Sequence, residues 1–262
     1  MVKYIKFGVY FFRGRSILAI GYISNINGVI NPIGEICKIA REYNVITVID
    51  AAQAAPHIPL DVIALDCDFL AFSGHKILGP AGTGVLYGKY ELLEALEPLI
   101  LAGGTVDKVT HNSFSLKPLP HRLEPGTPNI SGVLGLGAAV SYIQNMTFDT
   151  IMAHEKKLIE AMHESLGNLP GAKILSAKPG SNQIAVASVV PIEANIDSDA
   201  LCQVLSDSFQ IMTRSGFHCV HQLFNHYAFN KGAVRISAYI YNTVEDIYKV
   251  AEALRIVLNQ VT

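Results

Sequence analysis

Apolar runs and helical patterns alternate through the first half of the chain. The runs that predict strands lie at residues 16–24, 45–50, 67–73 and 82–88. A helical pattern opened by Pro32 covers residues 32–44 and separates the first two runs. Because continuous apolar strands separated by helices are typical of a parallel sheet covered on both faces, we expect an α/β fold with a mainly parallel sheet.

The pattern changes near Ser131. Helical periodicity covers residues 131–146, 148–166 and 198–209, and strand-like runs cover residues 183–192 and 233–241. A final helix starts at a capping box formed by Thr243 and Asp246. One face of that helix carries the apolar residues Val244, Ile247, Val250, Ala251, Leu254 and Val257. We therefore predict a large domain over residues 1–144 and a smaller α+β domain over residues 145–262.

Composition limits the classes of function. Half of the 262 residues are hydrophobic, which predicts a folded globular protein, and the formal charge is only −2. No basic run interleaves with aromatic residues, so a small-molecule ligand is favoured over nucleic acid. The apolar runs are too short to cross a bilayer and no signal-peptide cleavage site is evident, which predicts no membrane association and a cytoplasmic location. The four cysteines form no CxxC pair, and we expect reduced thiols.

Two polar residues end neighbouring predicted strands. Asp50 closes the run at 45–50, and Lys76 follows the run at 67–73. Ligands of parallel sheets bind at the carboxyl ends of strands, so both side chains are expected to point into one crevice. Lys76 has an ordinary interpretation, in which its stem packs and its ammonium reaches water. The alternative is a lysine that binds pyridoxal 5'-phosphate covalently, because such an amine loses its charge readily in a partly desolvated pocket.

Asp50 favours the second interpretation. The cofactor needs a carboxylate at its pyridine nitrogen so that the ring can absorb electrons from the substrate carbon. An acid that closes an apolar strand is poorly explained as a surface charge, although it could cap the following segment, residues 51–56. Gln53 could donate a hydrogen bond to the ring's phenolate oxygen, and Ser73 and His75 could hold the phosphate.

Several ordered motifs resemble one known family. They are "VIDAAQAAPHIPLDVIALDCDFLAFSGHKILGPAGTGVLYG" (48–88), "SNINGVINPI" (24–33), "EPGTPNISGVLGLGAAVSYI" (124–143), "RSGFHCVHQL" (214–223) and "VRISAYIYNTVEDI" (234–247). Together they resemble the class V aminotransferase family of fold-type I pyridoxal-phosphate enzymes, and within it the SufS-like cysteine desulfurases. The resemblance implies that Lys76 carries the cofactor, Asp50 pairs with the pyridine nitrogen, Gln53 contacts the ring oxygen, and Ser73 and His75 bind phosphate.

The resemblance also implies a homodimer. Gly126 and Thr127 match residues that reach the phosphate of the neighbouring subunit. Asn25 and Arg235 match positions that hold the substrate carboxylate, and Arg214 matches a third position in the same pocket. A planar fork of donors suits a carboxylate, although Arg235 could instead form a surface ion pair.

Cys219 separates a desulfurase from an ordinary aminotransferase. A desulfurase needs a thiolate that attacks the substrate sulfur, and Cys219 matches the family's persulfide-forming cysteine. We expect Arg214 and His218 nearby to favour its ionised form, whereas Cys37 and Cys202 on predicted helices read as small buried hydrophobes. Phe217 departs from the family, which often carries a histidine there. With Cys219 we count Lys76, as the base at the substrate α-carbon, and His75 as catalytic.

The amino end departs further from the family. Members carry a long segment before the motif at 24–33, and residues 1–15 match no part of it. We therefore expect an amino-terminally truncated member: a fragment, half of a split enzyme, or a shortened protein whose dimer partner covers the gap. The leading function is conversion of L-cysteine to L-alanine, with persulfide passed from Cys219 to a sulfur-acceptor protein for iron–sulfur cluster assembly. A selenocysteine lyase and a catalytically silent subunit are the alternatives, and no metal site is expected.

Overall fold

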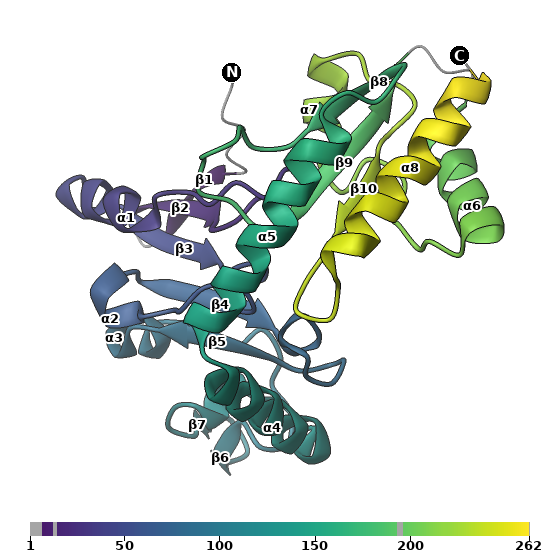
Figure 1. Cartoon of the computed structure of the whole chain (residues 1–262). Helices are drawn as coiled ribbons and strands as arrows, with labels where there is room; N and C mark the ends of the chain where they lie inside the picture. Colours follow the sequence, from purple (N-terminus) through teal and green to yellow (C-terminus); the bar gives the residue numbers. More distant parts are fainter. Residues whose placement is uncertain (1–6, 13–14, 193–195, 262) are drawn as a thin grey trace.

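The computed structural model describes residues 7–12, 15–192 and 196–261 (Figure 1). The strands are β1 (Phe7–Phe12), β2 (Arg15–Gly21), β3 (Ile46–Asp50), β4 (Phe69–Ser73), β5 (Gly84–Gly88), β6 (Val106–Val109), β7 (Phe114–Leu116), β8 (Ala172–Leu175), β9 (Val186–Pro191) and β10 (Val234–Ser237). The α-helices are α1 (Ile33–Glu42), α2 (Val62–Leu65), α3 (Tyr90–Glu94), α4 (Ile130–Met146), α5 (Phe148–Leu166), α6 (Ser198–Phe209), α7 (His221–His226) and α8 (Val244–Val261). Two short 3-10 helices are η1 (Gly74–Ile77) and η2 (His121–Leu123).

The largest sheet has the strand order β1-β2-β3-β4-β5. The central pairs β2–β3 and β3–β4 are parallel, with Gly21 opposite Asp50 and Asp50 opposite Ala71. The carboxyl ends of these three strands therefore meet at one edge of the sheet. The chain segments that follow them start side by side at that edge, as expected for the ligand-binding side of an α/β sheet.

This sheet is mixed, whereas the sequence pattern predicted a mainly parallel one. The edge pairs β1–β2 and β4–β5 are both antiparallel. The reason lies in the connections: β4 reaches β5 through η1 and a short loop, without the helical crossover that a parallel pair needs. The α/β class is confirmed, but only the three middle strands run parallel.

The second half forms an antiparallel sheet with the order β10-β9-β8, packed against α5, α6 and α8. Its core includes the buried residues Leu158, Leu166, Leu201, Leu205 and Leu254. The predicted capping box of α8 is confirmed, because Thr243 N–H donates to Asp246 Oδ2 at 2.9 Å and Asp246 N–H donates to Thr243 Oγ1 at 3.2 Å. The strand β8 was not predicted from the sequence.

Helix α5 connects the two halves. It begins beside α4 and runs to the small sheet, where it lies against α8 (Figure 1). A hydrophobic cluster at this junction combines Ala55 and Ile77 from the first half with Tyr239 from the segment after β10. The residues that follow β3 and β4 are therefore packed directly against the small lobe.

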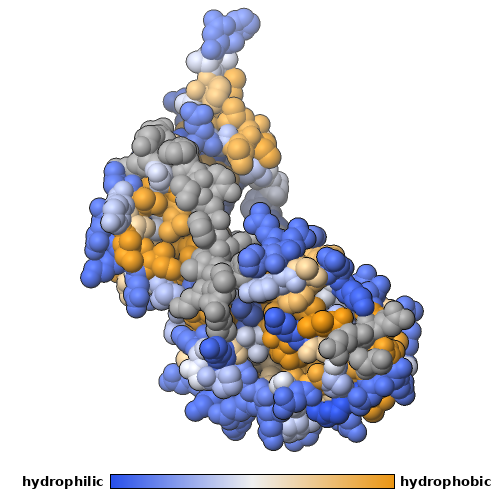
Figure 2. Space-filling view, turned by 90° about the horizontal axis from the view of Figure 1, so that it is seen from above, coloured by the Kyte–Doolittle hydropathy of each residue, from blue (hydrophilic) through white to orange (hydrophobic). Residues whose placement is uncertain are grey.

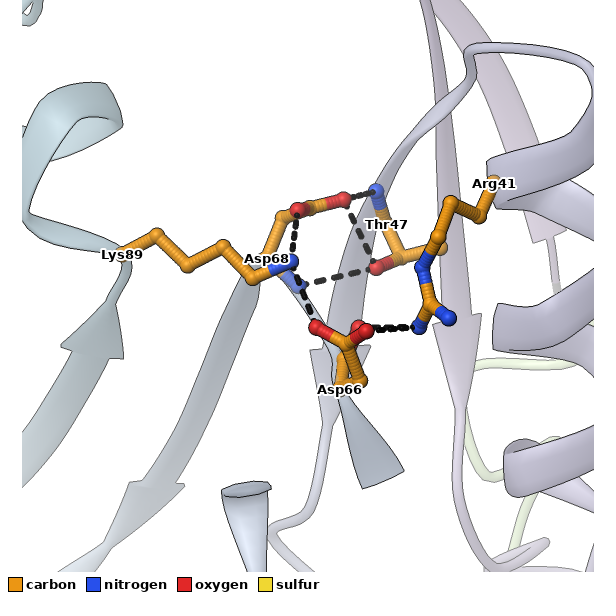
Figure 3. A network of polar contacts seen from close by, with 5 residues as sticks. All are labelled: Arg41, Thr47, Asp66, Asp68 and Lys89. Atoms are coloured by element: carbon orange, nitrogen blue, oxygen red, sulfur yellow. Dashed lines mark hydrogen bonds and ion pairs between the residues drawn. The ribbon is translucent and has the colours of Figure 1, made fainter. Parts of the chain in front are cut away.

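A polar network ties the opposite ends of the strands together (Figure 3). Asp68 Oδ2 accepts hydrogen bonds from the N–H and the hydroxyl of Thr47, at 2.9 and 3.1 Å. Lys89 Nζ lies 2.9 Å from Asp68 Oδ1 and 2.8 Å from Asp66 Oδ1. Arg41 forms a further ion pair with Asp66. The network joins the start of β3, the start of β4 and the end of β5 on the side away from the candidate site.

The molecular surface carries hydrophobic areas as well as charged ones. On the face seen from above, Figure 2 shows hydrophobic patches bordered by hydrophilic residues. Among the described residues, no helix combines the length and apolar character that a membrane span requires.

Candidate active site

Asp50 occupies the carboxyl end of β3 and is exposed. Its Oδ1 accepts a hydrogen bond from Ala52 N–H at 2.9 Å, which is the local capping contact that the sequence offered as an alternative. The backbone of the same residue is fixed, because Tyr22 N–H donates to Asp50 O at 2.8 Å. The carboxylate is thus held at the strand end with its side chain open to solvent, and Gln53 lies half-buried in the turn that follows.

Lys76 lies in η1, directly after β4, and is half-buried. The loop around it is tight. Gly74 N–H donates to Thr83 O at 2.8 Å, and Gly79 N–H donates to Gly74 O at 2.9 Å. A Cβ at Gly74 would lie 2.1 Å from Thr83 Oγ1, which donates a hydrogen bond to Pro80 O, so a larger residue would force this side chain to move. The backbone of Lys76 is therefore fixed beside the end of β3, because β3 and β4 are neighbouring parallel strands.

The expected phosphate ligands lie in two places. Ser73 is half-buried at the end of β4, and its side chain makes no capping hydrogen bond to η1. His75 is exposed within η1. Gly126 and Thr127 lie on a separate loop before α4, and residues 124–131 are exposed throughout. Ser73 and His75 thus lie next to Lys76 in the chain, whereas Gly126 and Thr127 lie on an exposed loop.

Asn25 and Arg235 are brought together by the fold. Arg235 Nη1 donates to Asn25 O at 3.1 Å, although the two residues lie 210 positions apart. Asn25 Nδ2 in turn donates to His218 O at 3.0 Å. Asn25 therefore joins the arginine of β10 to the loop that carries Cys219.

The two arginines of the predicted pocket pair through their backbones. Arg235 N–H donates to Arg214 O at 2.7 Å, and Arg214 N–H donates to Arg235 O at 3.2 Å. Burial and then the nearby charge of Arg214 lower the pKa of Arg235, whereas Cys219 opposes the shift. The buried Nε of Arg235 has no hydrogen-bond partner in the described part of the chain. A buried donor of this kind fits a carboxylate ligand.

Cys219 lies in a loop with unusual backbone conformation. Gly216, His218 and Cys219 have φ values of +104°, +48° and +61°. Such values are uncommon for residues other than glycine, and they often occur at functional loops. Of the four cysteines, all of which the structure describes, Cys219 is the one that is exposed.

His218 lies half-buried beside Cys219. Burial is the main cause that lowers the pKa of His218 from its usual value of 6.5, and its Nε2 lies 3.1 Å from Ala233 O. The lowered pKa disfavours the positively charged form of His218, so it weakens the help that His218 was expected to give to the Cys219 thiolate. Arg235 is a cation that interacts electrostatically with Cys219.

The other cysteines lie in apolar or half-buried positions. Burial raises the pKa of Cys37, and it raises that of Cys67 to about 11. Cys202 is half-buried, burial raises its pKa, and its Sγ lies 3.0 Å from Thr213 Oγ1. Thiols with raised pKa values form little thiolate at neutral pH, so these three positions do not suit a nucleophile.

Phe217 fills the place where the resembled family often has a histidine. Its ring stacks on His221 with a centroid distance of 5.0 Å and meets the edge of Phe224 at 5.3 Å. The phenylalanine thus anchors the Cys219 loop to a hydrophobic cluster that includes Leu223 and Phe224.

Sequence reasoning missed a buried polar group behind the site. His57 and Glu155 are both buried, and His57 Nδ1 lies 2.9 Å from Glu155 Oε1. Tyr239 donates a hydrogen bond to Pro56 O. Glu155 lies on the buried face of α5 with Ile151 and Leu158. A lone acid in an apolar helical stripe was the available signal, because a buried charge requires a partner. Within the described residues no cluster of three or more potential metal ligands occurs.

Comparisons with known proteins indicate one family. The family model described as aminotransferase class-V matches residues 13–250. A probable cysteine desulfurase of Xylella fastidiosa is 37% identical over 238 residues, which are 91% of this chain and 56% of that protein. A probable cysteine desulfurase of Halalkalibacterium halodurans is 40% identical over 238 residues, with 91% and 57% covered. The chain thus spans little more than half the length of these relatives.

Solved structures show the same likeness. The cysteine desulfurase CsdA of Escherichia coli superposes with a TM-score of 0.85 at 32% identity, covering 94% of this chain and 60% of that one. The apo cysteine desulfurase of Thermococcus onnurineus gives a TM-score of 0.86 at 34% identity, with 93% and 60% covered. The family model matches most residues of this chain, and the chain therefore belongs to the aminotransferase class-V family.

Proposed function

We propose that the chain acts as a pyridoxal-phosphate-dependent cysteine desulfurase in the cytoplasm, producing L-alanine and supplying sulfur for iron–sulfur cluster assembly. The observation that carries the proposal is the connection of Arg235 through Asn25 to the Cys219 loop. It joins a group suited to a substrate carboxylate to an exposed thiol. The names of the similar proteins support the same reaction.

The residues present fit the cofactor. Asp50 is an exposed carboxylate at the end of β3, suited to pair with a protonated ring nitrogen, and Lys76 follows the neighbouring strand. Ser73 and His75 would hold the phosphate, and Gln53 would meet the ring oxygen. When bound, pyridoxal phosphate supplies an electron-accepting ring that weakens bonds at the substrate α-carbon.

The protein's own groups would handle the substrate as follows. Arg235, with its unpartnered Nε, would hold the carboxylate of cysteine, assisted by Arg214 and Asn25. The Lys76 amine would accept the α-proton. The Cys219 sulfur would attack the substrate sulfur, so that an S–S bond forms as the carbon–sulfur bond breaks. The electron pair of the broken bond leaves with the carbon fragment, which takes up one proton at Cβ and regains the α-proton from Lys76 to become alanine. The persulfide on Cys219 remains for an acceptor protein.

We further propose a homodimer built on α4. Ile130, Val133 and Leu134 are exposed on this helix at a spacing that places them on one face. An exposed apolar stripe favours association with another surface. Gly126 and Thr127 immediately precede the stripe, so pairing of α4 faces would bring them to the interface. We also propose that the large domain covers residues 1–144 and that the smaller domain covers residues 145–262.

Cofactor binding by the purified chain tests the proposal. With added pyridoxal phosphate, we expect a visible absorption band that Lys76→Ala abolishes and that the exposed Lys38→Ala retains. A wild-type chain that stays colourless would contradict the cofactor assignment and would favour the catalytically silent alternative.

Product formation tests the chemistry. Cys219→Ser is expected to reduce alanine formation from cysteine by about 100-fold or more, because the nucleophile is lost. Cys202→Ser serves as the matched control and should retain the activity. Alanine formation that survives Cys219→Ser would contradict the desulfurase, and parallel assays with selenocysteine decide whether the substrate is the heavier analogue.

A further inference from the structure

The buried polar group behind the site forms a closed ring of contacts. Glu155 Oε1 accepts a hydrogen bond from Ala185 N–H at 3.0 Å and lies 2.9 Å from His57 Nδ1. Ala185 O accepts from Ala238 N–H at 3.0 Å. The next residue, Tyr239, donates its hydroxyl to Pro56 O, and Pro56 precedes His57. The ring therefore returns to its start after joining α5, the residue before β9, the segment after β10 and the turn after β3.

The ring is almost fully shielded from water. Glu155 is 5% exposed, and His57 and Tyr239 are each 7% exposed. The side chains of His57 and Tyr239 meet edge to face, with ring centroids 4.8 Å apart and an interplanar angle of 69°. A buried carboxylate is costly without partners. Ala185 N–H is the hydrogen-bond donor to Glu155, and His57 Nδ1 lies within ion-pair distance of it without meeting hydrogen-bond geometry.

The ring connects two parts of the candidate site. The turn that contains Pro56 and His57 begins at Asp50 and includes Gln53. On the other side, Ala238 and Tyr239 follow the strand that carries Arg235. His57 and Glu155 also line a pocket of about 530 Å³. The hydrophobic cluster of Ala55, Ile77 and Tyr239 packs the turn on one side, and the polar contacts of the ring hold it on the side of this pocket.

We propose that Glu155 is a positioning residue that fixes the turn bearing Asp50 and Gln53 relative to the strand bearing Arg235. The roles of Asp50, Gln53 and Arg235 rest on the proposed function. The ring of contacts through Glu155 that joins the turn to the strand does not depend on it. Replacing the carboxyl group of Glu155 by an amide would keep the side chains of Asp50 and Arg235 but loosen their placement relative to each other.

Hydrogen exchange of the full chain without cofactor tests the connection. In Glu155→Gln, which keeps the size of the side chain, we expect exchange to quicken by about tenfold in residues 51–58 and 234–239. The exposed Glu160→Gln on the same helix should leave both segments unchanged. Exchange that rises equally in every segment, or that stays unchanged in residues 51–58, would overturn the proposal.

A second variant protects the test against misfolding. His57→Gln changes the other partner of the His57–Glu155 contact, and we expect it to quicken hydrogen exchange in the same two segments. The double variant should add little to either single change, because both remove one interaction. If the changes in hydrogen exchange of the two single variants add up in the double variant, the two residues act separately, and the proposal that the ring acts as one unit is overturned.

Cofactor spectroscopy then connects the ring to the site. With pyridoxal phosphate, Glu155→Gln is expected to raise the cofactor dissociation constant by about fivefold or more and to shift the pH at which the visible band changes. If Glu155→Gln quickens hydrogen exchange but leaves the cofactor dissociation constant and the visible band unchanged, the positioning role is overturned. A wild-type chain that never binds the cofactor would instead contradict the proposed function, and the exchange experiment would still decide the connection.

Discussion

Asn25 contacts two segments that lie far from it along the chain. Its side chain donates to His218 O, and its backbone O accepts from Arg235. The motifs of the sequence predicted that Asn25 and Arg235 share a pocket, and the hydrogen bond between them supports that grouping. The pocket roles of both residues remain predictions that the substrate experiments test.

Gly28 is a position where one methyl group should matter. Its φ is +72°, and a Cβ there would lie 2.6 Å from Ile184 O. Ile184 N–H also donates to Gly28 O at 2.9 Å, so the backbones approach closely. We predict that Gly28→Ala lowers the free energy of unfolding by about 1–3 kcal/mol, measured by urea denaturation.

Gly34 provides the matched control for that change. It lies in α1, and a Cβ would meet nothing within 4 Å. Gly34→Ala should therefore leave stability unchanged or raise it by about 0.5–1 kcal/mol, because alanine favours the helix. Equal effects of the two substitutions would contradict the role assigned to the backbone contact.

Single residues also show where pattern reasoning failed. His218 was expected to favour the ionised form of Cys219, but the burial that lowers the pKa of His218 could be known only from the folded loop. The contact between His57 and Glu155 joins a turn to a distant helix, and no local pattern specifies that pairing. In contrast, Cys219 was distinguished from Cys37 by its glycine-bearing polar surroundings, and the exposure of Cys219 agrees with that interpretation.

At the scale of elements, the network in Figure 3 should stabilise the sheet in a pH-dependent way. A hydrogen bond from Lys89 is the main cause that lowers the pKa of Asp66 below its usual value of 3.8. Since the folded pKa is the lower one, the stabilisation is fully present above about pH 4 and is lost as the pH falls through the folded value.

Lys89→Met tests this network. We predict a loss of about 1 kcal/mol in the free energy of unfolding at pH 7, because Asp68 loses its cation while partly buried. The difference from wild type should shrink as the pH falls below about 4, measured by denaturation across a pH series. Lys156→Met, exposed on α5, is the control. A difference that is constant with pH would contradict the assigned ion pairs.

The elements themselves were largely predictable. The periodic patterns of α4, α5, α6 and α8 predicted helices that the structure confirms, with α8 beginning at its capping box. Strand β1 at residues 7–12 was missed, because its pairing partner β2 defines it more than its own pattern does. The antiparallel direction of β5 was missed because strand direction depends on the connection and not on the run of apolar residues.

At the scale of the whole molecule, the stripe on α4 predicts association. We expect Leu134→Asp to convert a dimer to a monomer, measured by analytical ultracentrifugation, because a charge would be buried at the interface. Ile63→Asp, at an exposed position on α2, should leave the association unchanged. A wild-type chain that sediments as a monomer at every concentration would contradict the proposed dimer.

The sequence by itself determined the helices, the central strands and the order of the motifs, because hydrophobic periodicity and turn chemistry act over a few neighbouring residues. Those motifs also indicated the family that the comparisons show. Only the tertiary structure decided the mixed direction of the large sheet, the burial of His218 and the ring through Glu155. Each of these depends on burial and on contacts between residues far apart in the chain, and the free energy of a buried polar group is set by the partners that the fold brings to it.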